Sequence, residues 1–265
     1  MKLIKYPDTG QFRNVVATVN RMATFVGLDD NGDAILDETL PKPTIIFKGT
    51  VKIHGTNGGV SFKEREYWVQ SKGNIITIGN DNAGFASFVE SKKEVFKKFV
   101  EQINSANLES LSKNTFTIYG EWAGGNIQKN VAVCELEKSF FIIGLKVTPN
   151  DGETPSYWIP SSYLKSPEDR IYNIEDFETF EIEIDFNNPQ LVQNKFVELI
   201  KYVEDECPVA KHFGVSGIGE GIVWTGSYKG QTLRFKTKGE KHAGKSKVKT
   251  VKPVDEGRLA IVNEV

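Results

Sequence analysis

The stretch TIIFKGTVKIHGTNGGVSFKEREYWVQS, residues 44–71, decides the fold class of this chain. It is rich in β-branched and aromatic residues and is broken by glycines, a pattern typical of antiparallel strands joined by turns. Further strands are expected around residues 116–122, 140–147, 180–186, 221–225 and 232–238. The sequence therefore predicts an α+β protein of mostly antiparallel sheets.

Three other segments have apolar residues at helical spacing, which predicts amphipathic helices flanking the sheets. They are residues 12–25 with Gly27 as a C-cap, a helix capped by Asp81 or Asn82 and running to Ile103, and a helix that starts at Asn188-Pro189 with Leu191 in its apolar stripe. Asp29-Asp-Asn-Gly-Asp33 is expected to be a hairpin turn. A calcium loop is excluded, because Gly32 at its sixth position would put Gly27 at the first ligand position.

Charge is distributed unevenly along the 265 residues. The net charge is only −2, which excludes a uniformly basic nucleic-acid binder, but residues 229–252 contain nine Lys or Arg and one acid. Residues 168–185 contain eight acids and one Arg. No apolar run could cross a bilayer, and the N-terminus has no signal core. Cys134 and Cys207 are expected to be reduced thiols, which predicts a cytoplasmic protein. Because no segment could cross a bilayer, we expect no membrane partner.

The octapeptide GEKHAGKS, residues 239–246, matches the phosphate-loop pattern G-x-x-x-x-G-K-[ST]. A phosphate loop follows a buried strand and opens a helix. Here the preceding residues alternate apolar with charged side chains, and the following ones are β-branched and end at Pro253. The context therefore argues against a phosphate loop.

The densest group of chemically unusual residues is Lys52-Ile-His-Gly-Thr-Asn57. A lysine in a strand that runs into glycines is either a nucleophile beside accessible backbone or a surface lysine before a turn. Downstream lie Gly120-Glu121, then Glu220-Gly-Ile-Val223, then Lys236-Thr-Lys238, whose two lysines share one face of a strand. Each motif alone is weak evidence for a site, since strand ends often carry charges and glycines often mark turns.

In this order, the four motifs resemble those of the covalent nucleotidyltransferase superfamily, which includes polynucleotide ligases and mRNA capping enzymes. Lys-x-His-Gly-Thr-Asn is similar to RNA ligases of the phage T4 RNA ligase 2 type, and residues 70–77 and 81–86 look like phage members of that group. The resemblance runs from Phe12 to Lys249. It implies a nucleotidyltransferase (adenylation) domain, in the host-cell cytoplasm if the protein is phage-encoded.

The resemblance implies an ATP-dependent RNA ligase that joins 5′-phosphate and 3′-hydroxyl RNA ends. Lys52 would attack the α-phosphate of ATP, Lys236 and Lys238 would stabilise the developing charge, and Glu220 would hold Mg²⁺ or Mn²⁺. The implied nucleotide-binding residues are Val51, Ile53, Thr56, Asn57, Lys72, Glu121, Ile143, Lys236 and Lys238. The implied RNA contacts are His54, for which simple packing is an equal alternative, Lys72, Lys241, Lys245 and Lys247. The sequence identifies no protein partner.

Two positions depart from the family pattern. Lys72 stands where an arginine is usual, and lysine lacks the bidentate fork. Ile143-Gly144 stands where many members have Phe-Asp, so adenine would contact aliphatic surface or another aromatic ring. With 27 residues after Lys238, we expect one domain over residues 1–265, with a basic C-terminal segment and without an OB-fold or helical C-terminal domain. A non-catalytic nucleotide-binding or RNA-binding module, or a DNA-ligase or capping type of enzyme, stays an alternative.

Overall fold

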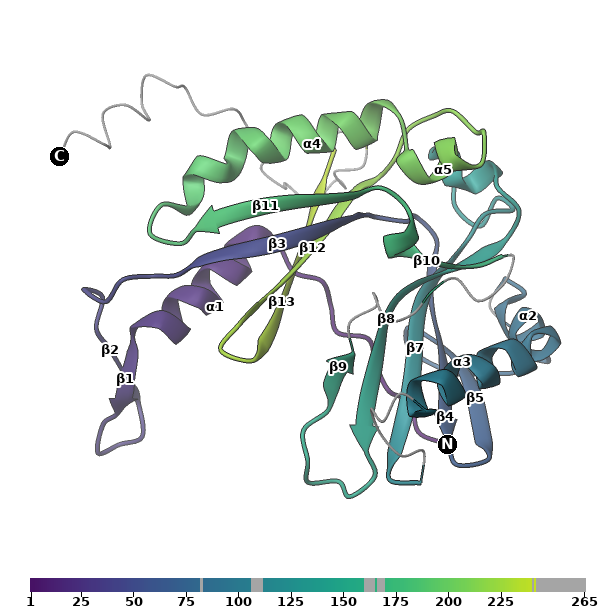
Figure 1. Ribbon diagram of the computed structural model, residues 1–265, viewed down its shortest axis with the longest axis horizontal. Coiled ribbons are helices and arrows are strands. Elements are labelled where there is room, and N and C mark those ends of the chain that lie inside the picture. The colour runs from purple at the N-terminus through teal and green to yellow at the C-terminus, as the bar shows by residue number, and fades with distance from the viewer. Residues whose placement is uncertain (82, 106–111, 160–164, 166–169, 240, 242–265) are drawn as a thin grey trace. The chain divides into compact units, whose positions relative to one another are not determined.

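The structure of the protein is a computed structural model, which describes residues 1–265 except 82, 106–111, 160–164, 166–169, 240 and 242–265 (Figure 1). The chain divides into two compact units, each built from segments that are distant in sequence. The first unit contains Met1–Pro7, Ile53–Glu178 and Pro208–Gly217, and the second contains Asp8–Lys52, Thr179–Cys207 and the chain from Ile218 onward. The expectation of one domain over residues 1–265 stays a prediction.

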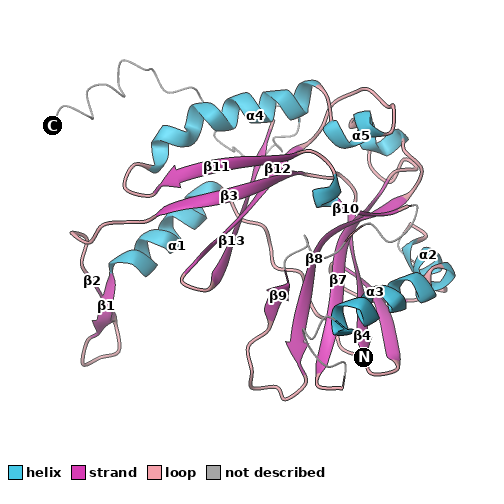
Figure 2. Cartoon of the chain, viewed as in Figure 1, coloured by secondary structure: helices cyan, strands magenta, loops and turns pink. Residues whose placement is uncertain are grey.

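A large, mostly antiparallel sheet forms the first unit (Figure 2). Its order is β10-β8-β7-β4-β5-β6, and β9 also pairs with β8. Among the described strands of this sheet, β10 and β8 form the parallel pair. The strands are β4 (Thr56–Lys63), β5 (Glu66–Ser71), β6 (Ile75–Ile76), β7 (Asn114–Ala123), β8 (Ser139–Pro149), β9 (Tyr157–Ile159) and β10 (Ile171–Asn173). The predicted strands around 116–122 and 140–147 are confirmed.

Two helices, α2 (Phe85–Ser91) and α3 (Lys93–Ser105), cover one face of this sheet. Phe88 of α2 packs on Trp122, and Phe96 of α3 packs on Phe140. The prediction of one continuous helix to Ile103 is wrong. The helix breaks at Lys92, whose φ of −117° is not helical, so α2 ends and α3 begins there. The side chain of Ile103 and the alternative cap Asn82 lie outside the described residues. The unit also contains α5 (Pro208–His212) and the short 3-10 helices η1 (Ala132–Glu135) and η3 (Ile174–Asp176).

Gly84 occupies the N-cap position of α2, and the side chain of Asp81 caps the helix from three residues earlier. Its carboxylate accepts hydrogen bonds from the backbone N–H groups of Ala86 and Ser87, at 2.6 and 2.9 Å, and from the Ser87 hydroxyl at 2.8 Å. Because these N–H groups have no partner inside the helix, we expect Asp81→Ala to lower the free energy of unfolding by about 1–2 kcal/mol. Urea unfolding of Asp81→Ala and of Asp81→Asn, which keeps one acceptor oxygen, tests this. Equal stability of Asp81→Ala and wild type would contradict it.

The second unit is built on a smaller sheet of order β11-β3-β12-β13, antiparallel throughout. Helices α1 and α4 pack on one face, where Phe12 and Phe196 contact each other and Phe235. The elements are α1 (Phe12–Thr24), β1 (Phe25–Leu28), β2 (Ala34–Leu36), β3 (Thr44–Val51), β11 (Thr179–Asp185), the 3-10 helix η4 (Pro189–Val192), α4 (Gln193–Asp205), β12 (Gly221–Tyr228) and β13 (Gln231–Lys238).

Most local predictions for the second unit are confirmed, with two corrections. Residues 29–33 form the turn of the β1–β2 hairpin, where the Asp29 carboxylate accepts from the N–H of Asp33 at 2.8 Å. Gly27 is not the C-cap of α1, because the helix ends at Thr24 and Gly27 lies in β1. Leu191 does not join the apolar stripe of α4, because it lies in η4 and is 45% exposed.

Cys134 and Cys207 are both free thiols, as expected. Within the described part of the chain, no helix combines the length and the apolar character that crossing a membrane requires.

Candidate active site

The strand register of the second unit brings three predicted site residues together. β12 lies between β3 and β13, with Ile222 opposite Val51 and Gly221 opposite Lys238. The N–H of Lys52 donates to the carbonyl of Gly221 at 2.8 Å, which extends the β3–β12 pairing by one residue. Lys52 and Lys238 therefore flank Gly221 at one end of the sheet, and Glu220 is the next residue along the chain.

Glu220 joins the two lysines through its carboxylate. Its Oε2 accepts from Lys52 Nζ at 2.6 Å and its Oε1 pairs with Lys238 Nζ at 2.5 Å. The glutamate side chain is 2% exposed, whereas those of Lys52 and Lys238 are 20% and 31% exposed. A buried carboxylate is stable only when it is paired, and the two ammonium groups supply that pairing. Both amines stay within reach of solvent and of a substrate.

Gly221 makes this arrangement sterically feasible. Its φ is +147°, and a Cβ there would lie 2.1 Å from the carbonyl oxygen of Thr237, which is backbone and cannot move aside easily. A side chain would push β12 away from β13, and with it Glu220 away from Lys238. The sequence indicated this glycine only as part of Glu220-Gly-Ile-Val223.

We expect Gly221→Ala to lower the free energy of unfolding by about 3 kcal/mol, because backbone strain and the clash with β13 add together. Gly230 in the β12–β13 turn is the matched control. It also has a positive φ, +77°, but nothing lies within 4 Å of its Cβ position. Gly230→Ala should cost only about 1–2 kcal/mol. Equal losses in urea unfolding would show that the contact with Thr237 does not matter.

Lys236 lies on the same side of β13 as Lys238, as the i, i+2 spacing predicted. The intervening Thr237 is buried and accepts a hydrogen bond from the Trp224 indole at 3.0 Å. The backbone N–H of Lys236 donates to the carbonyl of Gly10 at 3.1 Å, which fixes this part of the strand. The face that carries Lys236 and Lys238 is therefore the one turned away from α1 and α4.

In the first unit, Glu121 and Asn57 are direct neighbours on β7 and β4. Glu121 Oε1 accepts from the N–H of Gly55 at 3.3 Å, and the Asn57 amide donates to the carbonyl of Gly120 at 3.4 Å. Gln128 Nε2 donates to the carbonyl of Gly55 at 3.1 Å. Gly55 is thus held from both sides, which ties the Ile53–Asn57 segment to β7. Gln128 was not predicted from the sequence, because an isolated loop glutamine belongs to no motif.

Gly55 itself has no room for a side chain. A Cβ there would lie 2.4 Å from the carbonyl oxygen of Trp122. This close approach explains the glycine of Lys-x-x-Gly physically. It lets the chain pass directly against β7 after the lysine.

The departure at Ile143-Gly144 falls on a β-bulge. Tyr119 pairs with Gly144 but Gly120 pairs with Ile142, so Ile143 is the extra residue and is half-buried. The ring of Trp158 from β9 lies over Gly144, 3.1 Å from the position of its missing Cβ. An aromatic ring therefore takes the space above Gly144. The sequence did not single out Trp158, because its placement depends on β9 pairing with β8.

Tyr119, the residue before Gly120-Glu121, anchors this part of β7. Its ring is fully buried and contacts Tyr6 and Trp158, and its hydroxyl donates to the carbonyl of Ile4 at 2.5 Å. Burial raises the pKa of the Tyr119 phenol well above its usual range. The phenol therefore stays a hydrogen-bond donor, and the N-terminal segment stays attached to β7.

The remaining predicted residues are placed as follows. Val51 and Ile53 are buried, so the Val51 side chain belongs to the core face of β3. Thr56 is half-buried and opposes Trp122, His54 is half-buried, and Lys72 is exposed in the turn after β5. Lys241 is exposed, and its N–H donates to Glu204 at 2.9 Å. Lys245 and Lys247, like most of GEKHAGKS, lie outside the described residues.

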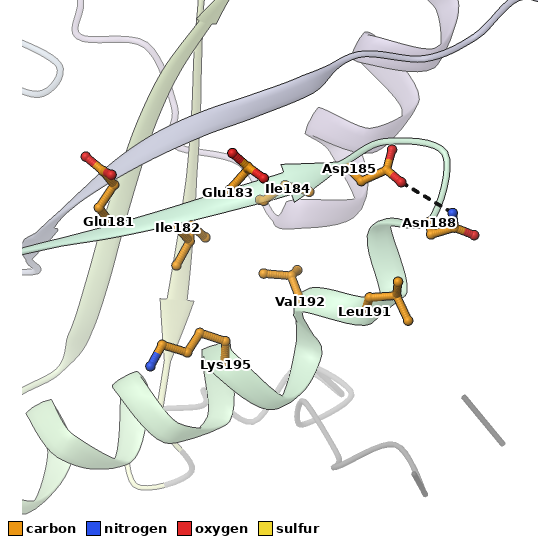
Figure 3. A pocket seen from close by; sticks show the side chains of 9 residues that line it. All are labelled: Glu181, Ile182, Glu183, Ile184, Asp185, Asn188, Leu191, Val192 and Lys195. Carbon is orange, nitrogen blue, oxygen red and sulfur yellow. Dashed lines mark hydrogen bonds between the residues drawn. The ribbon is translucent and has the colours of Figure 1, made fainter. Parts of the chain in front are cut away.

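A cavity of about 390 Å³ in the second unit is separate from these residues (Figure 3). It lies between β11 and the η4–α4 segment, where Ile182 points toward the helix and Glu181 and Glu183 point to the other side of the strand. Its lining contains Glu181, Ile182, Glu183, Ile184, Asp185, Asn188, Leu191, Val192 and Lys195. None of the predicted site residues is among them.

Within the described residues, no group of three or more His, Cys, Asp or Glu side chains could hold a metal by itself. The Glu220 carboxylate contacts both Lys52 and Lys238, and its two oxygens are a donor type that Mg²⁺ and Mn²⁺ accept. Mg²⁺ commonly uses one or two carboxylates and completes its shell with waters and substrate phosphates. The residues present thus fit a metal that arrives with a nucleotide.

Comparison with known proteins connects this geometry to a family. Residues 46–238 match a family model described as RNA ligase. The fold resembles that of Naegleria gruberi RNA ligase with PPi, with a TM-score of 0.52 and 16% identity, over 92% of this chain and 58% of that one. Two variants of the same ligase, one with ATP and Mn and one with AMP and Mn, each match with a TM-score of 0.51, 15% identity, and coverage of 90% and 57%. The chain spans a little more than half the length of these structures.

Proposed function

Because the chain belongs to the RNA ligase family, we propose that it joins RNA ends in an ATP-dependent reaction through AMP carried on Lys52. The observation that carries this proposal is the cluster in which the buried carboxylate of Glu220 holds the amines of Lys52 and Lys238. A partly exposed amine beside a carboxylate and a second cation is suited to attack phosphorus. The family match supports the ligase activity, and the cluster supports the mechanism.

In the first step, Lys52 Nζ attacks the α-phosphorus of ATP. An N–P bond forms, the bond to the bridging oxygen breaks, and pyrophosphate leaves. The attacking amine must lose a proton, and Glu220 Oε2 is its hydrogen-bond acceptor at 2.6 Å. Lys238 and Lys236 supply positive charge for the phosphate oxygens as negative charge develops on them.

In the second step, an oxygen of the RNA 5′-phosphate attacks the phosphorus of lysyl-AMP, and the N–P bond breaks to give adenylylated RNA. In the third step, a 3′-hydroxyl attacks that 5′-phosphate and AMP leaves. Both steps are in-line displacements, for which positioning and cationic stabilisation supply most of the catalysis. Lys238 serves all three steps in this scheme, because the same phosphorus centre or its neighbour reacts each time.

The first-unit residues are proposed to bind the nucleoside part of the substrate. Glu121 is suited to accept hydrogen bonds from ribose hydroxyls, and Asn57 and Thr56 offer amide and hydroxyl groups beside it. The base would contact Ile143 and Ile53. The hydrogen bonds that fix Gly55 between Glu121 and Gln128 support this assignment, because they hold the segment that joins Lys52 to Asn57.

A divalent cation, Mg²⁺ or Mn²⁺, would be held by Glu220 together with water and substrate phosphates. It would neutralise phosphate charge and act as a Lewis acid at phosphorus. The RNA ends, 5′-phosphate and 3′-hydroxyl, and the T4 RNA ligase 2 type of substrate choice are part of the proposal. Lys72 and His54 are proposed to contact RNA, as are Lys241, Lys245 and Lys247.

The test is label transfer from ATP to the protein. With a divalent cation, α-labelled ATP should leave label on the denatured protein and γ-labelled ATP should not, since pyrophosphate is the leaving group. Acid should release the label, as expected of a P–N bond. Transfer to 5′-phosphorylated RNA should follow, and GTP and DNA ends serve as comparisons. Binding of ATP without labelling would instead support a non-catalytic module.

A further inference from the structure

The smaller sheet presents more positive charge than the attack on ATP requires. Its outer face, the one turned away from α1 and α4, carries what we call the cation face, defined as Lys48, Lys52, Arg234, Lys236 and Lys238. The core face is fixed by buried Phe47, Ile222 and Phe235. Since side chains alternate along a strand, the charged residues at the intervening positions share the opposite face.

The register arranges these cations in rows across β3, β12 and β13. Lys52, Gly221 and Lys238 form the row of the proposed reaction. The next row is Thr50, Val223 and Lys236, and the row after that is Lys48, Thr225 and Arg234. Residues two apart in a strand are separated by about 6.8 Å, so Arg234 lies about 14 Å along β13 from Lys238.

The β12 residues between these cations are uncharged, which suits the binding of a polyanion. Val223 and Thr225 are half-buried and uncharged, so the cations on both sides have no acid between them on β12. Lys48 is exposed and Arg234 is half-buried. Acids appear on the far edge of the sheet, where Glu181 on β11 lies opposite Lys48. Positive potential therefore extends from the reaction row along β13, and Arg234 adds a fork suited to phosphate.

We propose that Lys48 and Arg234 bind the phosphodiester backbone of the RNA strand, one or more nucleotides away from the end that reacts at Lys52. The proposal rests on the proposed function, because it takes RNA as the substrate. The triphosphate of ATP is too compact for this role. Its phosphates are joined by single oxygens, and its α-phosphorus must lie at Lys52, two rows away.

The test is the salt dependence of RNA binding. Fluorescence anisotropy would measure the binding of single-stranded 5′-phosphorylated RNA at a series of salt concentrations. The proteins compared are wild type, Lys48→Ala, Arg234→Ala and the double variant. The slope of log K, the association constant for RNA, against log salt concentration is negative. Each lost phosphate contact should make it less steep by about 0.7, so the double variant should be less steep by about 1.4. Labelling of Lys52 from ATP should stay within about 2-fold of wild type, because neither residue touches the reacting row.

Two further variants serve as controls. Lys195→Ala removes the same charge from α4, on the opposite side of the sheet, and should leave the slope unchanged. Glu181→Gln removes the acid opposite Lys48 and should tighten RNA binding at low salt, a gain that misfolding cannot produce. Thermal unfolding of each variant checks that the fold is intact.

Unchanged slopes in Lys48→Ala and Arg234→Ala would overturn the proposal. A higher KM for ATP with an unchanged RNA slope would also overturn it, and would assign the two residues to the triphosphate. Failure of the proposed function is seen separately, as a wild-type protein that takes no label from ATP. In that case, the salt dependence of RNA binding by wild type and the variants would still test the role of the cation face.

Discussion

Lys52→Ala is expected to abolish label transfer from α-labelled ATP, a loss of at least about 1,000-fold, because the variant has no amine to form the N–P bond. Lys52→Arg is the matched control. It keeps the positive charge and a partner for Glu220, but a guanidinium stays protonated and is a poor nucleophile. Both variants should therefore fail. If Lys52→Arg retained label, the charge at this position would be the essential feature and not the nucleophile.

Loss of activity in Lys52→Ala must be separated from loss of structure. The chemistry offers a bypass, because RNA that is already adenylylated enters at the third step, which does not use the Lys52 amine as a nucleophile. Lys52→Ala should therefore still seal adenylylated RNA to a 3′-hydroxyl end, at a rate within about 10-fold of wild type. Loss of this reaction too would mean that Lys52 is needed to hold the site together. Undiminished labelling in Lys52→Ala would place the adenylate elsewhere and defeat the proposed mechanism.

Glu220→Gln is expected to lower both stability and labelling. The glutamate is 2% exposed and pairs with Lys52 and Lys238, so an amide in its place leaves two ammonium groups without their counter-charge. Removal of one partner from a buried ion pair typically costs about 3–5 kcal/mol, and we expect the lower end because both lysines reach solvent. Urea unfolding measures this loss. Labelling of Lys52 should fall about 100-fold or more, since the acceptor of its proton is gone.

A second substitution separates the two effects. In the double variant Glu220→Gln with Lys238→Met, one uncompensated charge is removed, so part of the lost stability should return. Labelling should not return, because the carboxylate is still missing and Lys238 no longer faces the α-phosphate. If stability and labelling recovered together, Glu220 would act only as the counter-charge of the two lysines. If neither Glu220→Gln nor the double variant lost stability, the buried ion pairs would not contribute to the free energy of unfolding.

The sequence was sufficient for the elements with strong local patterns. Strands were expected around β7, β8 and β13, with alternating apolar and charged residues along β13, and helical spacing predicted α1. It failed where one residue interrupts a continuous pattern. The apolar stripe from Phe85 to Val100 is compatible with one helix, and only packing against the large sheet shows that the chain turns at Lys92.

The candidate site divides in the same way. The motifs pointed to Lys52, Glu220 and Lys238 only when their order along the chain was considered, since each motif alone is weak evidence. That one carboxylate contacts both amines depends on the β3–β12–β13 register, which no local pattern encodes. Gln128 and Trp158 were missed for a related reason. Each acts on a backbone position far away in sequence, Gly55 in one case and Gly144 in the other.

Residues 44–71 show what each level of structure decides. The sequence determined that this stretch consists of strands, because β-branched and aromatic residues fit a pleated surface, and it placed Lys52 three residues before Gly55. Only the tertiary structure decided that its consecutive strands β3 and β4 belong to different sheets. The physical reason is that backbone pairing is non-local: β3 finds its partners in β11 and β12, and β4 in β5 and β7. Lys52 ends the part of the chain that pairs in the smaller sheet, and Gly55 approaches β7 of the large sheet.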